Sequence, residues 1–158
     1  ADRPPTTDYM DLKIKITGLL PSALFDGTGE WLNVTIESGN LHPFARNLRD
    51  DEELFVDYLF YLTCIDWKTH LTMVYHLTST RHRHNMVVRS NLDRTLPEIE
   101  SVTNIWQTAN FHEREVYEMF GVNFLNHPDL RLLILPDGWE GRNPMRKDFE
   151  DPINMIKL

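Results

Sequence analysis

A run of carboxylates and imidazoles in the C-terminal half is the part of this sequence that could do chemistry. His112, Glu113, Glu115 and Glu118 lie within seven positions of one another, and His127 follows shortly after. Glutamate and histidine side chains bind metal ions and act as general acids or bases. The first interpretation to weigh is therefore an embedded metal site or acid–base site.

The spacing of these residues argues against such a site. The His-Glu pair at 112–113 is followed by Val116, where a zinc protease of the H-E-x-x-H type has its second histidine. Glu115-x-x-Glu118 lacks the histidine of the Glu-x-x-His unit found in carboxylate di-iron bundles. A small carboxylate-based metalloenzyme that uses Glu115, Glu118 and His127 is therefore kept only as an alternative from another class.

Two further candidates are weaker. His82 and His84 could share one strand face, but no third ligand is close in sequence, so we expect both to be exposed to solvent. Cys64 is the only cysteine, and its apolar neighbours predict a buried side chain. An iron–sulfur cluster typically needs four thiolates. No G-x-S-x-G, G-x-G-x-x-G or P-loop pattern occurs, so no catalytic site is evident in this chain alone.

Length, composition and charge narrow the class of protein. A chain of 158 residues with 41% hydrophobic and 25% charged residues is typical of one globular domain. The sequence has no run of about 18 apolar residues, so we expect membrane contact only through partners. The net charge of −8 argues against nucleic acid as a ligand, because phosphate binding needs a basic surface.

The elements that must position the charged run predict a two-layer α+β domain. Hydrophobic periodicity and composition favour strands at 12–17, 31–37, 55–65, 71–78 and 84–88, and an amphipathic helix at 41–48. A buried helix also fits 55–65. Pro4-Pro5 predicts an extended or disordered lead over residues 1–10. We expect a mainly antiparallel, mixed sheet with helices on one face.

A helix over residues 110–120 is expected to carry the charged run. Asn110 and Glu113 have the spacing of a capping box, and Gly121 is well placed as a left-handed C-terminal cap. Ser101 is expected to cap a short helix just before it.

Residues 121–158 are expected to form an extended C-terminal docking arm, separate from an α+β domain at 1–120. The segment is rich in proline and shows little periodicity, and unstructured runs of this length are uncommon in compact domains. Residues such as Trp139 and Phe149 make it too apolar for a disordered tail. We expect the arm to pack along this domain and to continue over a partner.

Arginine and aromatic side chains in this region favour an interface. Arg114, Arg131 and Arg146 suit bidentate pairing with carboxylates across desolvated contacts, and Trp139 adds an aromatic group of the kind enriched in interface cores. A salt-bridge network within the domain is the alternative. Arg114 and Glu118, for example, lie one helical turn apart and can pair.

The charged run and the residues after it resemble one family signature. The pattern is Glu113-Arg114-Glu115-x-x-Glu118-Met119-Phe120, followed by His127, Arg131 and Leu133-Ile134, and it continues in Asn126–Arg131, Asp137–Gly141 and Arg146–Phe149. It is similar to that of the 30-kDa subunit, known as the C subunit, of complex I, the proton-pumping NADH:quinone oxidoreductase. The resemblance covers about residues 31 to 150. Departures are mild: Glu118 stands where aspartate is commoner, and Phe111 where tryptophan is usual.

The resemblance implies a non-catalytic structural subunit of the peripheral arm of NADH:quinone oxidoreductase. The chain would pack on the quinone-site D subunit, which is of the 49-kDa type, with the B and I subunits as further partners. It would support electron transfer from NADH to quinone with no cofactor of its own, since FMN and iron–sulfur clusters would lie in other subunits. Its place would be peripheral, on the cytoplasmic face of the inner membrane or on the matrix face of mitochondria.

The resemblance also implies which residues dock. The helix 110–120 and the arm would be the docking elements, and the residues would be Arg114, Glu115, Glu118, His127, Asp129, Arg131, Trp139, Arg146 and Lys147. We expect the three arginines to make buried pairs with a partner. The nearest alternative is the equivalent subunit of a related membrane-bound nickel–iron hydrogenase or ferredoxin-linked complex, which differs in its partners.

Overall fold

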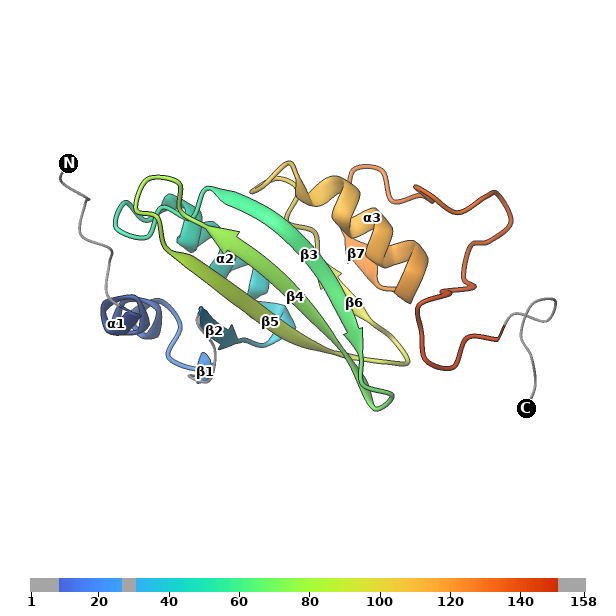
Figure 1. The fold of residues 1–158 in the computed structure, drawn as a ribbon, viewed down its shortest axis with the longest axis horizontal. Coiled ribbons are helices and arrows are strands. Elements are labelled where there is room, and N and C mark those ends of the chain that lie inside the picture. The colour runs from blue at the N-terminus through green and yellow to red at the C-terminus, as the bar shows by residue number, and fades with distance from the viewer. Residues whose placement is uncertain (1–8, 27–30, 151–158) are drawn as a thin grey trace.

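The structure, a computed structural model, describes residues 9–26 and 31–150 and combines a sheet with helices on one face (Figure 1). The helical elements are α1 (Tyr9–Leu19), η1 (Ser38–Asn40), α2 (Leu41–Asp50) and α3 (Ala109–Phe120). The strands are β1 (Leu24–Asp26), β2 (Leu32–Thr35), β3 (Tyr58–Asp66), β4 (His70–Thr78), β5 (Asn85–Asp93), β6 (Glu98–Glu100) and β7 (Asn123–Leu125). Most of the expected lead at 1–10 lies outside the described residues. The predicted α+β class is confirmed.

The main sheet has the strand order β1-β2-β5-β4-β3. Two hairpins join β3 to β4 and β4 to β5 in antiparallel register, and β2 lies parallel to β5, so the sheet is mixed as predicted. The β3–β4 turn contains Lys68 with a positive φ of 71°. The short strands β6 and β7 pair in parallel beside the main sheet, which periodicity did not predict. Residues directly after Gly121 are therefore part of a sheet.

One apolar core lies between the sheet and the helices. On β4, Leu71, Met73, Tyr75 and Leu77 alternate inward and are at most 1% exposed. Side chains from α1, α2 and α3 belong to the same buried cluster, so all three helices cover the same face. Figure 1 shows α2 behind strands β3 to β5. Burial of each large side chain contributes about 1.5–3 kcal/mol, which makes this core the main source of stability.

The predicted strand at 12–17 is wrong, because these residues lie in helix α1. Leu12 and Ile16, four residues apart, are 3% and 0% exposed, whereas Ile14 between them is 67% exposed. Burial thus follows the helical period. Three apolar residues at alternate positions fit a strand, but two of them also fit one helix face.

The histidine pair in the β4–β5 turn also departs from expectation. His84 is buried, and only His82 has a solvent-accessible environment, with its Nε2 atom 2.8 Å from the Glu52 carbonyl oxygen. The turn is closed by Ser79, whose N–H donates to the His84 carbonyl oxygen. His84 therefore lies at the base of a tight loop and not on an open strand face. Cys64 is buried and unpaired, as predicted.

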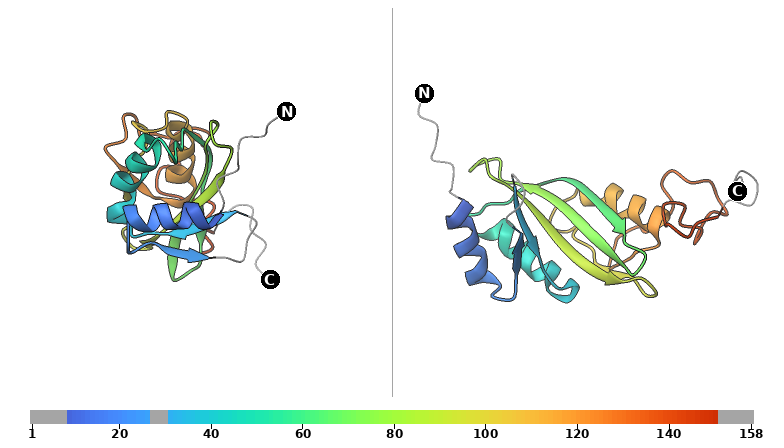
Figure 2. Two further views of the ribbon diagram at one scale, coloured as in Figure 1. Left: turned by 90° about the vertical axis from the view of Figure 1, so that its left-hand side faces the viewer. Right: turned by 60° about the horizontal axis from the view of Figure 1, so that its bottom comes forward.

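The segment after β7 runs along α3 and lies at the end of the molecule opposite α1 (Figure 2). Its described part, residues 126–150, contains no further helix or strand. Residues 151–158 of the predicted arm lie outside the described residues.

Candidate functional site

The charged run lies on α3, where the arm leaves the domain (Figure 1). Three of its side chains are almost completely buried: Glu113 is 0% exposed, Glu118 2% and Arg114 7%. Burial of an ionisable group is costly unless hydrogen bonds or an opposite charge compensate for the lost water. The groups that these side chains contact therefore reveal what the charged run does.

Glu113 binds the segment that precedes α3. Its carboxylate accepts hydrogen bonds from the Ser101 hydroxyl at 2.6 Å, the Val102 N–H at 2.8 Å and the Thr103 hydroxyl at 3.2 Å. The predicted capping box is wrong, because Thr108 is the N-cap residue and Glu113 is occupied elsewhere. The short helix expected after Ser101 is a series of turns. Burial raises the pKa of Glu113 to about 7, although its hydrogen bonds oppose this shift.

Arg114 and Glu118 bind the arm. The Arg114 guanidinium donates to the carbonyl oxygens of Arg131 at 3.1 Å and Leu132 at 2.8 Å. The Glu118 carboxylate accepts the N–H groups of residues 133, 134 and 135 at 2.9–3.2 Å. The expected Arg114–Glu118 pair is not formed, since each side chain forms hydrogen bonds with backbone groups of the arm instead. We call these two side chains and the backbone of 131–135 the α3 clamp.

The chemistry of the α3 clamp follows from its side-chain types. A guanidinium has only donors and a carboxylate has only acceptors. Arginine therefore satisfies carbonyl groups and glutamate satisfies N–H groups of an irregular segment that has no ladder partner. Hydrogen bonds to charged groups are worth about 1.5–3 kcal/mol each, more than neutral ones.

His127 links the start of the arm to the same helix. Its Nε2 atom lies 3.3 Å from the Asn110 carbonyl oxygen and 3.7 Å from Glu113 Oε2. Its Nδ1 atom accepts the N–H of Asp129 at 2.9 Å. The neutral ring therefore carries its proton on Nε2, directed toward Asn110. Burial lowers the pKa of His127, which favours this neutral form.

Asp66 holds the far part of the arm and was not among the predicted docking residues. Its carboxylate, at the end of β3, accepts the backbone N–H of Lys147 and of Lys68 at 2.8 Å each, and the Arg94 guanidinium at 2.9 Å. Burial alone would raise the pKa of Asp66, but these donors prevail and lower it to about 2. The Arg146 Nε–H also donates to the Phe120 carbonyl oxygen. The arm therefore folds back onto its own domain.

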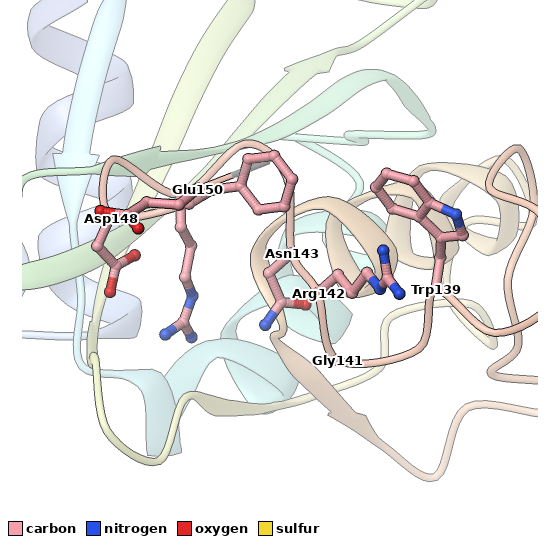
Figure 3. Close-up of a pocket in the computed structure, with 8 residues that line it drawn as sticks. Trp139, Gly141, Arg142, Asn143, Asp148 and Glu150 are labelled. Carbon is pink, nitrogen blue, oxygen red and sulfur yellow. The ribbon is translucent and has the colours of Figure 1, made fainter. Parts of the chain in front are cut away.

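The arm also forms a shallow pocket of about 460 Å³ (Figure 3). Arg142 lies over the ring of Trp139 at 4.8 Å, and Asn143 and Asp148 contribute to the lining. Gly121 has a φ of +79°, and a Cβ there would approach Asn143 to 2.5 Å, so the predicted glycine cap also makes room for the arm. No serine, cysteine or histidine lines this pocket, so it has no nucleophile–base pair.

The structure gives no metal centre in the part of the chain that it describes. No group of three or more histidine, cysteine, aspartate or glutamate side chains there could hold a metal ion. Glu118 is directed to the arm backbone and Glu115 is exposed, so the ligand set Glu115, Glu118 and His127 is not assembled. Across the described ranges, no helix has the length and apolar character to span a bilayer.

The predicted docking residues fall into two groups. Arg114, Glu118, His127 and Arg146 bind within the chain, and Trp139 is partly exposed beside Arg142. Glu115, Asp129, Arg131 and Lys147 are exposed, and Arg131 donates only to Asp129 at 2.8 Å. Sequence analysis missed the exposed apolar residues Ile134 and Met145, which are 65% and 59% exposed. Isolated apolar residues in an aperiodic segment gave no signal for their exposure.

Comparison with known proteins identifies relatives. The family described as respiratory-chain NADH dehydrogenase, 30 Kd subunit, matches residues 34–153. The C subunit of NADH-quinone oxidoreductase from Roseiflexus castenholzii is 36% identical over 140 residues, which are 85% of this chain and 79% of that protein. The C/D subunit from Phocaeicola vulgatus is 40% identical over 79% of this chain, which spans only 24% of that longer protein. The C subunit of F(420)H(2) dehydrogenase from Methanosarcina mazei is 42% identical over 60% of this chain and 61% of its own.

Two solved structures share the fold. A trypsin-resistant fragment of Nqo5 superposes with a TM-score of 0.64 at 24% identity, over 75% of this chain and 98% of the fragment. A chain of the membrane-bound sulfane sulfur reductase, an archaeal respiratory membrane complex, gives 0.78 at 24% identity, over 89% of this chain and 85% of that one.

Proposed function

This chain belongs to the family of the 30-kDa subunit of respiratory-chain NADH dehydrogenase, and we propose that it is a non-catalytic structural subunit in the peripheral arm of an NADH:quinone oxidoreductase. The observation that carries the proposal is the α3 clamp. The Arg114 and Glu118 side chains form hydrogen bonds with the backbone of the chain itself, so they are not free to act on a substrate. The chain would support electron transfer by holding other subunits in place.

We propose that a D-type subunit, of the 49-kDa kind, is the main partner. The Phocaeicola vulgatus relative is named as a C/D subunit, and two subunits joined in one chain are expected to lie side by side. The B and I subunits are proposed as further partners. FMN and iron–sulfur clusters would belong to other subunits, and the complex would hold this chain peripherally on the cytoplasmic face of the inner membrane, or on the matrix face of mitochondria.

The surface that would dock is the outer side of α3 and of the arm. Phe111, Ile134 and Met145 expose apolar area there, and such exposed groups are characteristic of surfaces that another protein covers. Arg131 and Lys147 add exposed cations beside them. The clamp fixes the arm backbone before docking, which lowers the entropy lost on binding.

A pull-down of the tagged chain from cells that make the complex tests this proposal. We expect a stoichiometric D-type subunit among the captured proteins. We also expect trypsin to cut the isolated chain after Arg142, which is exposed and lies outside the clamp, and to cut there much more slowly in the complex. Equal cleavage in both states, or the absence of a D-type subunit from the captured proteins, would contradict the proposal.

A second candidate is the equivalent subunit of a related respiratory complex with a different electron donor. It is favoured by the relative from Methanosarcina mazei, which is named as a subunit of F(420)H(2) dehydrogenase. A nickel–iron hydrogenase or ferredoxin-linked complex falls in the same class. The captured partners separate the two candidates, because a large nickel–iron subunit or an F420-oxidising subunit in place of NADH-oxidising subunits supports the second.

A further inference from the structure

No helix of the described residues covers the face of the main sheet that points away from α2 (Figure 1), although Val74 and Val87 on it are buried, at 3% and 5% exposed, among the larger side chains around them. We call it the outer face and define it by Trp31, Phe60, Val74, His76, Val87 and Arg89. These positions alternate with the inward side chains of the apolar core along β2 to β5. The solvated face of an antiparallel sheet is normally lined by polar residues. Here aromatic and branched apolar residues occupy its centre.

The aromatic groups of the outer face form one connected cluster. The Trp31 ring lies 5.8 Å from Phe60 and 6.0 Å from His76, and Phe60 lies 5.8 Å from His76. A bulge in β3 between Leu59 and Tyr61 brings a second ring into the cluster, because Tyr61 also lies 5.6 Å from His76. Edge-on and tilted packing of this kind fixes the rings in place. The face is therefore a preformed apolar platform.

The outer face carries few acidic residues, although the chain as a whole is acidic. Of the 24 acidic residues in the sequence, only Asp93 occupies an outward position on β2 to β5. It lies at the end of β5, and its carboxylate accepts the N–H and hydroxyl of Thr95. Among the described residues, the central part of these strands therefore presents no outward carboxylate, although the net charge of the chain is −8.

Arg89 lies in the middle of this acid-free region. In the sheet register it stands between Thr35 on β2 and Val74 on β4. Its Nε atom is buried without a hydrogen-bond partner, and its guanidinium has no ion pair within the described residues. After burial, the charge of Arg89 is the cause that lowers the pKa of His76. A buried donor without an acceptor is destabilising, and a carboxylate is the acceptor that best fits a guanidinium.

We propose that the outer face is a second protein interface, covered by a partner protein that presents an aspartate or glutamate to Arg89 from an otherwise apolar surface. Charge complementarity supports this occupant, since Arg89 lacks a carboxylate and its neighbours are apolar. Arginine with aromatic side chains is also the mix enriched in interface cores. The inference goes beyond the proposed function, because this face lies on β2 to β5 and meets α3 only at its edge, where the Tyr61 ring lies 5.9 Å from that of His112.

Hydroxyl-radical footprinting of the isolated chain and of the purified complex tests the inference. We expect slower oxidation of Trp31, Phe60 and His76 in the complex, and unchanged oxidation of Met10 on α1, which is 56% exposed. Protection of Ile134 and Met145 without protection of the outer face would overturn this inference and leave the proposed function standing. Protection of the outer face without protection of the arm would support this inference and contradict the docking surface of the proposed function.

Variants at Arg89 test whether the partner presents a carboxylate to this residue. Tagged wild-type and variant chains are expressed together, and their ratio in the purified complex is measured. For Arg89→Gln we expect at least about a thirtyfold fall in incorporation, because removing one partner of a buried charge pair weakens binding by that order. Arg89→Lys should retain part of the incorporation, and the control Arg46→Gln on α2 should match wild type. Equal incorporation of Arg89→Gln would overturn the carboxylate contact.

Two measurements keep this test decisive. Thermal unfolding of isolated Arg89→Gln shows whether the variant folds, and if it does not, the footprint of the wild-type complex decides alone. Analytical ultracentrifugation of the isolated wild-type chain tests for self-association. A dimer whose outer face is already protected would identify a second copy as the occupant, and that result would overturn the proposed partner.

Discussion

The sheet core and the α3–arm region are held together in different ways. In the core, large side chains such as Met73 and Leu71 are 0% exposed, and stability is spread over many apolar contacts. In the arm, no regular element forms between residues 126 and 150, and Glu118, Arg114 and Asp66 hold the backbone through individual hydrogen bonds. A dense run of ionisable residues can therefore stabilise an irregular backbone segment through hydrogen bonds instead of taking part in catalysis. The two regions should respond differently to substitution.

The largest effect is expected from the core variant Met73→Ala. It removes a fully buried side chain between the sheet and the helices, and such truncations lower the free energy of unfolding by about 2–5 kcal/mol. Urea unfolding measures the loss. Ile14→Ala on the exposed side of α1 is the control and should change the free energy of unfolding little. If Met73→Ala loosened only the arm and left the free energy of unfolding unchanged, the proposed difference between core and arm would be contradicted.

A smaller and local effect is expected from Glu118→Ala. The variant removes the acceptor of three consecutive N–H groups at 133–135. Since a hydrogen bond to a charged group contributes about 1.5–3 kcal/mol, these amides should exchange with solvent at least about tenfold faster. Residue-resolved hydrogen exchange measures this. Glu115→Ala, one turn away and exposed, should leave it unchanged. Equal acceleration in β4 would show that the clamp and the core are not independent.

The contact between Asp66 and the arm should depend on acid pH. The pKa of Asp66 is about 2 in the folded chain, below its ordinary 3.8, so the stabilisation is complete above about pH 4 and is lost as pH falls through about 2. The difference between the two pKa values corresponds to about 2 kcal/mol, to which the N–H groups of Lys147 and Lys68 and the Arg94 guanidinium all contribute. The chemical shift of the Lys147 amide proton, followed from about pH 5 to about pH 1, should show this transition. Asp66→Asn should abolish it, whereas a midpoint near 4 would contradict the proposed contact.

The sequence predicted the sheet better than the arm, and for a physical reason. Alternation of Leu71, Met73 and Tyr75 with polar or smaller residues predicts a strand, and the structure has it, although Thr72 and Val74 on its other face are buried as well. The three residues Leu12, Ile14 and Ile16 fit two periods, so the strand predicted there was wrong. The strands β6 and β7 have only three residues each, too few for a periodic signal.

The candidate site was predictable in its residues but not in their contacts. The positions of Glu113, Arg114 and Glu118 on one helix followed from the apolar pattern and from the Gly121 cap. Arg114 and Glu118 bind backbone groups of 131–135, and Glu113 binds the Val102 N–H together with the hydroxyls of Ser101 and Thr103. Every residue offers the same backbone groups, so no side-chain pattern identifies the partners of Arg114 and Glu118. Local spacing predicted a capping box and an Arg114–Glu118 pair. In the structure, Glu113 and Glu118 instead form hydrogen bonds with segments that are distant from them in the sequence.

The smallest effect on the isolated chain is expected from Arg131→Gln. Arg131 is 70% exposed and pairs only with Asp129, which is 52% exposed, and such surface pairs add little to stability. Its backbone carbonyl, which the Arg114 guanidinium binds, is unchanged by the substitution. The urea midpoint should therefore match wild type. If Arg131 docks as proposed, incorporation into the complex should fall sharply, because the carboxylate of the partner would be buried without its cation.

Arg114→Gln should behave in the opposite way. This substitution removes the donors to the Arg131 and Leu132 carbonyl oxygens and so loosens the arm before any partner is present. Arg131→Gln that lowered the urea midpoint as much as Arg114→Gln would mean that Arg131 stabilises the fold itself. The division between side chains that hold the arm and side chains that it offers to a partner would then be wrong.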